Sequence, residues 1–189
     1  MSLQFPKPPI KTTSVLKKGL IGARAPVTSA GDFAYLKPHP VYHLTEKAIL
    51  AGRWLRSAKL QAWRYLIIEG DSVAASASLC RSKPKSTFRF SSLVDAPGGL
   101  WEACFAIADF ISSRTDFEIR SLSIPFLNIG ALWLHASNHG DQFVILPPSF
   151  SPFHSFAVYS EIELKRSLLT AVKLQSANLE KSARRQSHR

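Results

Sequence analysis

Two strand-like segments joined by a two-residue turn constrain the fold of this chain more than any other feature. The segments cover residues 63–69 and 72–80, and Gly70-Asp71 between them is a typical hairpin turn, because glycine tolerates a positive φ. Such a short connection favours antiparallel pairing of the two strands. The second arm consists mostly of Ala and Ser, whose small side chains allow a helix to pack closely above that strand.

The rest of the chain follows the order helix, strands, helix, strands, helix. Apolar patterns predict strands over 63–69, 72–80, 87–94, 117–124, 127–135 and 142–146, and helices over 44–60, 100–113 and 159–179. Thr45 and Ser160 are expected to cap the first and the last helix. Because successive strands have short connections, the predicted fold class is α+β, a single domain with a largely antiparallel sheet of about five to six strands packed by two to three helices.

The helix over 100–113 has so little polar face that it is expected to be buried against the sheet, with the small-residue strand 72–80 as its neighbour. Cys104 lies on its apolar face and is therefore expected to be buried and unreactive. The second cysteine is Cys80, and two cysteines are too few for a disulfide scaffold. They fit a reducing compartment.

Proline and charge divide the chain into three parts. Residues 1–40 are a basic N-terminal extension that contains several prolines and is predicted to be irregular, residues 41–179 are the α+β globular domain, and residues 180–189 are a basic C-terminal tail. An apolar fraction of 46% is enough for a core in one domain. Both basic ends are expected to be flexible.

The excess positive charge of the chain is confined to its ends. The formal net charge is +11, of which residues 1–25 contribute +5 and residues 165–189 contribute +6, so the residues between them are balanced. Exposed basic ends attract polyanions through counterion release, which does not depend on base sequence. Nucleic acid bound through these ends is therefore one interpretation, and tails that merely solubilise the protein are the other.

Neither a membrane span nor a secretory signal is predicted. No apolar run reaches the roughly 18–20 residues needed to cross a bilayer, and prolines interrupt the N-terminal segment. These features predict a cytoplasmic protein with no membrane partner. The first 30 residues lack acids and contain several Ser and Thr, which leaves organelle targeting as a lesser alternative.

Basic and aromatic side chains are interleaved in and before the strand predicted over 87–94. Simple alternation places Phe88 and Phe90 on one face of this strand and Arg89 and Leu93 on the other. Such a pattern serves phosphate contact and base stacking, and it is equally typical of a solvated loop that enters a half-buried strand. The candidate anion or nucleic-acid contacts are Arg81, Lys83, Lys85 and Arg89, together with Lys17, Lys18, Arg184 and Arg185 at the two ends.

A loop rich in proline and phenylalanine is the candidate protein-binding surface. Residues 145–156 contain Phe150, Phe153 and Phe156 among three prolines. Aromatic side chains held by prolines can form a rigid, partly apolar recognition patch. The alternative is a loop that crosses the core and buries these rings.

No sequence motif assigns catalysis, a metal or a cofactor. His135 and His139 are four residues apart, but Gly140 belongs to a predicted turn there, so the helical geometry of a zinc pair does not apply. With such constellations sparse and apolar residues plentiful, the preferred hypothesis is a non-enzymatic protein-interaction module, of the adaptor or inhibitor type. A nucleic-acid-associated protein is the first alternative. A small enzyme whose site is assembled from distant residues, such as His135 with Asp141, is the second.

Overall fold

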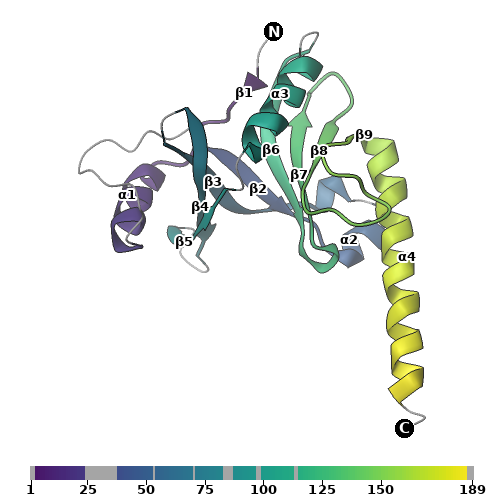
Figure 1. Ribbon diagram of the computed structural model, residues 1–189. Coiled ribbons are helices and arrows are strands. Elements are labelled where there is room, and N and C mark those ends of the chain that lie inside the picture. Colours follow the sequence, from purple (N-terminus) through teal and green to yellow (C-terminus); the bar gives the residue numbers. More distant parts are fainter. Residues whose placement is uncertain are drawn as a thin grey trace.

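A mixed sheet of nine strands runs through the described part of the chain (Figure 1). The structure is a computed structural model that describes residues 3–23, 38–52, 54–69, 71–82, 87–96, 99–112 and 115–186, with side chains described as far as residue 176. The strands are β1 (Leu3–Gln4), β2 (His39–His43), β3 (Lys59–Glu69), β4 (Ser72–Arg81), β5 (Phe88–Asp95), β6 (Phe117–Ile124), β7 (Ile129–His135), β8 (Gln142–Leu146) and β9 (Val158–Ser160). The helices are α1 (Thr12–Gly22), α2 (Glu46–Leu50), α3 (Leu100–Ser112) and α4 (Glu161–Gln186), with the 3-10 turns η1 (Leu55–Ser57) and η2 (Pro125–Leu127).

Most neighbouring strands in this sheet are antiparallel. The spatial order is β5-β4-β3-β2-β6-β7-β8-β9, and the exceptions are the central pair β2–β6, where Val41 lies beside Ser121, and the short strand β1, which also pairs in parallel with β6. The predicted α+β class and largely antiparallel single domain are therefore confirmed. The predicted numbers of strands and of helices are too low, because β1 and β9 have only two and three residues, β2 contains a proline, and α1 lies in the segment predicted to be irregular.

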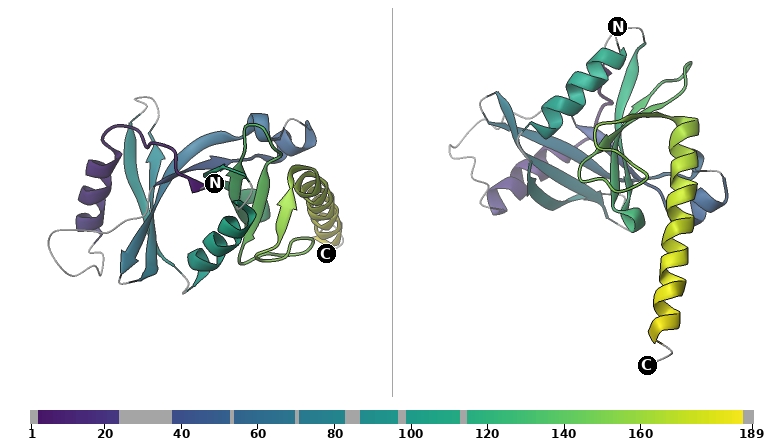
Figure 2. Two further views of the ribbon diagram at one scale, coloured as in Figure 1. Left: turned by 90° about the horizontal axis from the view of Figure 1, so that it is seen from above. Right: turned by 45° about the vertical axis from the view of Figure 1, so that its right-hand side comes forward.

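Helices cover both faces of the sheet (Figure 2). On one face α3 packs Trp101, Cys104 and Ala108 against β6, β7 and β8. On the other face α1 packs over β3 and β4, while α2 and α4 pack over β6, β7 and β8. Figure 2 shows α1 and α4 at opposite ends of the sheet. On this face, each half of the sheet is therefore covered by a different helix.

The irregular backbone predicted for residues 1–40 is wrong for residues 12–22, which form α1, whereas residues 5–9 have no regular secondary structure. Helix α1 buries Leu16 and Leu20 against β3 and β4, and the Tyr65 hydroxyl donates a hydrogen bond of 2.6 Å to Thr12 Oγ1. Two leucines four residues apart share one side of a helix and give it an apolar face to bury. The expected boundary between residues 40 and 41 lies inside β2, and residues 24–37 lie outside the described residues.

The helix predicted over 44–60 is much shorter than expected. It starts as predicted, with Thr45 Oγ1 accepting a backbone hydrogen bond of 3.4 Å, and it ends at Leu50. Gly52 then adopts a positive φ of 71°, a conformation that terminates helices. Apolar residues of the segment predicted as helical still contribute to the core, because Trp54 is buried under α4.

A bulge changes the face that Leu93 occupies. The pairing of β4 with β5 shifts by one residue at Ser91, so alternation fails beyond that point. Leu93 therefore returns to the face of Phe88 and Phe90, and all three side chains pack against the α1 cluster. The prediction that placed Leu93 beside Arg89 is wrong for this reason.

The two buried alanines of β4 lie under α1, whereas α3, the predicted neighbour of this strand, contacts β4 near its first residues. Ala75 and Ala77 are buried in the cluster that α1 covers. Helix α3 instead reaches β4 at Val73, whose N–H donates a 2.7 Å hydrogen bond to Glu102. The expected burial of Cys104 is confirmed, and this burial raises the pKa of its thiol to about 12.

Helix α4 has a packed half and a projecting half. It begins with the predicted Ser160 cap: Ser160 N–H donates to Glu163 Oε2 at 2.8 Å, and Glu163 N–H donates to Ser160 Oγ at 3.4 Å. Leu164 and Leu168 are buried in the core. The helix then runs past the body of the protein to Gln186, beyond the predicted end at residue 179 (Figure 1).

Candidate functional site

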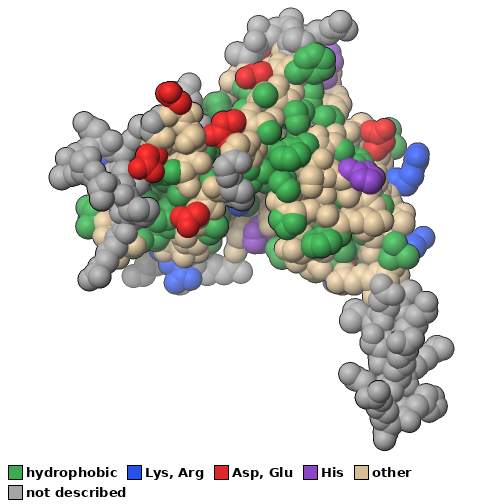
Figure 3. Space-filling view, in the orientation of Figure 1, with side chains coloured by type: hydrophobic (Ala, Val, Ile, Leu, Met, Phe, Trp, Pro, Cys, Tyr) green, Lys and Arg blue, Asp and Glu red, His purple; other side chains and the backbone are tan. Residues whose placement is uncertain are grey.

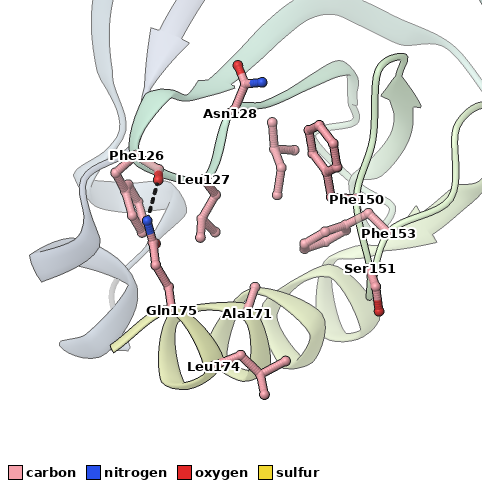
Figure 4. Close-up of a pocket in the computed structure, with 10 residues that line it drawn as sticks. Phe126, Leu127, Asn128, Phe150, Ser151, Phe153, Ala171, Leu174 and Gln175 are labelled. Carbon is pink, nitrogen blue, oxygen red and sulfur yellow. Dashed lines mark hydrogen bonds between the residues drawn. The ribbon is translucent and has the colours of Figure 1, made fainter. Parts of the chain in front are cut away.

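An apolar groove lies where three segments meet beside α4 (Figure 4). It has a volume of about 480 Å³. The turn η2 contributes Phe126 and Leu127, the loop between β8 and β9 contributes Phe150 and Phe153, and α4 contributes Ala171 and Leu174. The groove is thus assembled from residues that are far apart in the sequence.

The η2 wall of the groove is fixed by a tight turn and by α4. Pro125 begins η2, and Asn128 ends it with a φ of 51°, a left-handed conformation that asparagine tolerates. The Gln175 side-chain amide donates a 3.0 Å hydrogen bond to the Phe126 carbonyl oxygen (Figure 4). This bond ties the helix to the turn at one end of the groove.

The floor of the groove is buried, whereas its rim is exposed. Phe153 is 3% exposed, and its N–H donates a 2.8 Å hydrogen bond to the Phe150 carbonyl oxygen, so a tight turn sets the two rings. On the rim, Phe150 is 57% exposed and Leu174 is 52% exposed. Large apolar side chains left in water around a cavity are typical of a surface that another molecule covers.

Positive charge begins where the groove ends. The described lining of the groove carries no charged side chain. Lys173 is exposed next to Leu174, and the projecting part of α4 continues with Lys181, Arg184 and Arg185 against the single acid Glu180.

The three phenylalanines predicted as a recognition patch separate in the structure. Phe150 and Phe153 both line the groove, one on the rim and one on the floor. Phe156 is exposed outside the groove lining, with a φ of 63° and its N–H donating to the Ile145 carbonyl oxygen at 2.8 Å. The alternative of buried rings is therefore confirmed for Phe153 alone, whereas Phe150 and Phe156 are exposed and the recognition patch stays a prediction.

The predicted basic contacts do not gather into one patch in the described part of the chain. Lys17 and Lys18 are exposed on α1, which covers the face that carries Phe88. Arg89 alternates to the opposite face of the sheet, and Arg81 is exposed near the same end of the β4–β5 ladder. Lys83 and Lys85 lie outside the described residues, as do the side chains of Arg184 and Arg185.

A histidine–aspartate pair closes the connection between β7 and β8. His135 Nδ1 and Asp141 Oδ1 are 2.9 Å apart, and the same oxygen accepts the N–H of Ala136 at 3.1 Å. His135 lines a polar cavity of about 450 Å³ that His139 also lines. Among the described residues no hydroxyl or thiol hydrogen-bonds to His135, and no group of three metal-ligating side chains occurs. The contacts of Asp141 with His135 and with the Ala136 N–H therefore explain the pair as a structural feature that stabilises this turn.

Comparisons with known proteins leave the chain without a relative. No family model, no curated protein and no solved structure matches it. None of the helices in the described residues is both long enough and apolar enough to cross a membrane. What the protein does must therefore be inferred from its own surface.

Proposed function

We propose that this chain binds a segment of another protein in the groove beside α4. The observation that carries the proposal is the exposed apolar rim of Phe150 and Leu174 above the buried floor of Phe153. Rings and leucines placed in this way can anchor a few apolar side chains of a partner and exclude water from them. Such a protein acts by holding its partner, as an adaptor or an inhibitor does.

The partner segment has apolar side chains for the groove and acidic side chains beside them. The uncharged lining of the groove selects apolar groups, because a charge placed there would lose its water without gaining a counterion. Lys173 is exposed on α4 beside Leu174, and the sequence of the helix beyond the groove is rich in lysine and arginine, so opposite charge on a partner would steer it and fix its direction. We therefore expect an amphipathic, acidic peptide segment as the occupant.

Nucleic acid would use different parts of the same helix. The phosphate backbone pairs with lysine and arginine and gains nothing from an apolar rim. The basic positions of α4 after residue 176 would carry such binding, while Phe150 and Leu174 would not matter. A variant in the groove therefore separates the two functions.

Peptides selected from a displayed random library on the full-length chain provide the probe for the groove. Fluorescence anisotropy of a dye-labelled selected peptide then compares wild type with Phe150→Ala and with the matched control Phe110→Ala, whose ring is 83% exposed on α3. We expect Phe150→Ala to raise Kd roughly 30-fold, since truncating an anchoring aromatic costs about 2 kcal/mol. Phe110→Ala is expected to leave Kd unchanged.

Three outcomes would overturn this function. The selection yields no binding peptide, the selected peptides lack acidic and apolar residues, or both phenylalanine variants weaken binding equally. If a labelled single-stranded DNA binds instead, with a Kd that Phe150→Ala does not alter and that removal of residues 176–189 raises steeply, the nucleic-acid function replaces it.

A further inference from the structure

Arg64 places a partly buried guanidinium beside helix α3 without an acidic partner among the described residues. It lies on β3 directly opposite His39 of β2, and its guanidinium carbon is 5.6 Å from the centre of the Trp101 ring of α3. Its Nε is buried without a hydrogen-bond partner, and it forms no ion pair within the described residues. Burial lowers the pKa of this guanidinium, but an arginine in a protein stays charged near neutral pH.

Two buried polar side chains near Arg64 also lack partners. His39 is 0% exposed with both ring nitrogens unpaired, and Ser121 is 2% exposed with its Oγ unpaired. Burial, and to a smaller extent the charge of Arg64, lower the pKa of His39 to about 3, so its ring is neutral at pH 7. The region therefore contains one positive charge, several unused hydrogen-bonding groups and no counterion among the described residues.

Arg64 and Ser121 line a cavity of about 360 Å³ between the two halves of the sheet. The surface is hollowed between the side of the molecule that carries β3–β5 and the side that carries β7 and β8 (Figure 3). Leu146, Pro147 and Pro148 give the same cavity an apolar part of its lining. Arg64 is the one charged side chain of the described cavity lining, so the cavity combines a cationic group with an apolar part.

Arg120 shows how this protein satisfies a comparable arginine. It also lies over a tryptophan, 5.0 Å from the centre of Trp133, but its Nε donates a 2.6 Å hydrogen bond to Glu118. Arg64 has the ring contact without the carboxylate. A charge that is taken out of water without a counterion destabilises the folded state. A carboxylate supplied by a ligand would remove that cost, because it accepts paired N–H bonds from a guanidinium.

We propose that this cavity binds a small organic acid, whose single carboxylate pairs with Arg64 and Ser121 and whose apolar body lies against Leu146, Pro147 and Pro148. One guanidinium matches one negative charge, whereas a phosphate monoester carries a charge of about −1.5 to −2 at pH 7 and would keep part of it unpaired. A short aliphatic chain or a phenyl ring has the size that the cavity offers. The cavity shares Asn128 and Ile129 with the lining of the peptide groove, but its charged side chain, Arg64, does not line that groove.

Thermal unfolding of the full chain with sodium hexanoate, benzoate or phenylacetate tests this site at constant ionic strength. An acid present at one hundred times its Kd is expected to raise Tm by roughly 5–10 °C in a chain of this size. Calorimetric titration of the acid with the largest effect then gives its Kd. The uncharged amide of that acid, and phenyl phosphate, are expected to bind about tenfold more weakly or worse, because neither matches a single positive charge.

Variants of the two arginines decide where the acid binds. Arg64→Gln is expected to raise Kd about tenfold or more, whereas Arg120→Gln, which removes an arginine already paired, leaves it unchanged. Arg64→Met keeps an apolar stem over Trp101 and removes the charge, so its Tm without ligand is expected to equal or exceed that of wild type.

Any of three results overturns the proposal. Binding survives in both Arg64→Gln and Arg64→Met, none of the three acids shifts Tm, or Arg64→Met alone lowers Tm strongly, which would show that the charge is structural. The Tm of Arg64→Met is measured both with and without the acid. The proposal can therefore still be tested should Arg64→Gln fail to fold.

Discussion

The two basic ends of the chain resemble each other in charge and differ in what they do for the fold. Helix α1 lies against the sheet and buries Leu16 and Leu20, whereas the second half of α4 projects beyond the body (Figure 1). Both ends are rich in lysine and arginine, so charge does not decide the difference. The apolar residues do: residues 176–186 contain Leu179 and two alanines, too little apolar surface to hold a helix on a core.

Deleting each end in turn is the strongest way to break this comparison. Removal of residues 1–23 takes two buried leucines out of the α1 cluster, a loss of about 3–6 kcal/mol in the free energy of unfolding. That approaches the total stability of a typical domain, which is about 5–15 kcal/mol. Removal of residues 176–189 is expected to change the free energy of unfolding by less than about 1 kcal/mol. Urea unfolding followed by circular dichroism measures both, and equal losses would show that the two ends are not different in kind.

Two glycines of α1 sharpen the same comparison at the level of single atoms. A Cβ added at Gly19 would overlap the Phe90 ring of β5, while nothing lies within 4 Å of one added at Gly22. We expect Gly19→Ala to destabilise the protein by about 1–3 kcal/mol, the usual cost of overpacking. Gly22→Ala is the matched control, and it is expected to be neutral or slightly stabilising because alanine favours helix. If Gly19→Ala were as harmless as Gly22→Ala, α1 would not be docked on β5.

The capping box of α4 gives the smallest expected effect. Ser160→Ala removes the hydroxyl that caps the helix and is expected to cost about 1 kcal/mol, with no consequence for α1. The hydrogen bonds from the Ser160 side chain and backbone lower the pKa of Glu163. A carboxyl whose pKa is lower in the folded state contributes stability above its unfolded pKa, and this contribution is lost as pH falls through the folded value.

A pH series tests this part of the comparison. The stability difference between wild type and Glu163→Gln is expected to be present at pH 7 and to shrink in the acid range below the ordinary pKa of a glutamate. Glu161→Gln, in the same first turn but outside the capping box, is the control. If the difference in free energy of unfolding between wild type and Glu163→Gln stayed constant from pH 7 to pH 3, the capping carboxylate would be excluded as its source.

Local connections made the antiparallel part of the sheet predictable. The bounds of β6 and β8 agree with the prediction, because β6 is a stretch of mainly alternating apolar and polar residues and β8 is a short apolar run, and turn residues flank both. The parallel pair β2–β6 could not be predicted, since its partners lie far apart in the sequence and a period-two pattern does not name a partner. The bulge at Ser91 likewise cannot be recognised from the pattern of apolar and polar residues before the register of β4 and β5 is known.

The candidate sites were predictable to different degrees. Phe150 and Phe153 stand out as aromatics in a loop rich in proline, but Phe126 and Leu174 belong to segments that meet this loop only after folding. Arg64 carries a different signal, a single charged residue in the otherwise apolar run 62–68. A charge within such a strand is unusual enough to indicate a buried polar site, whatever motif is or is not present.

The central strand pair has a consequence for how the chain folds as it is made. The strands β3–β4–β5 and β6–β7–β8 each pair with neighbours in sequence, but Val41 of β2 has to find Ser121 of β6 across more than a third of the chain. Closing a loop of that length costs chain entropy before any contact repays it. During synthesis one edge of β2 lacks its partner until β6 has left the ribosome, and an open strand edge is where nascent chains associate. The middle of the finished sheet is therefore a part of the growing chain that is completed late.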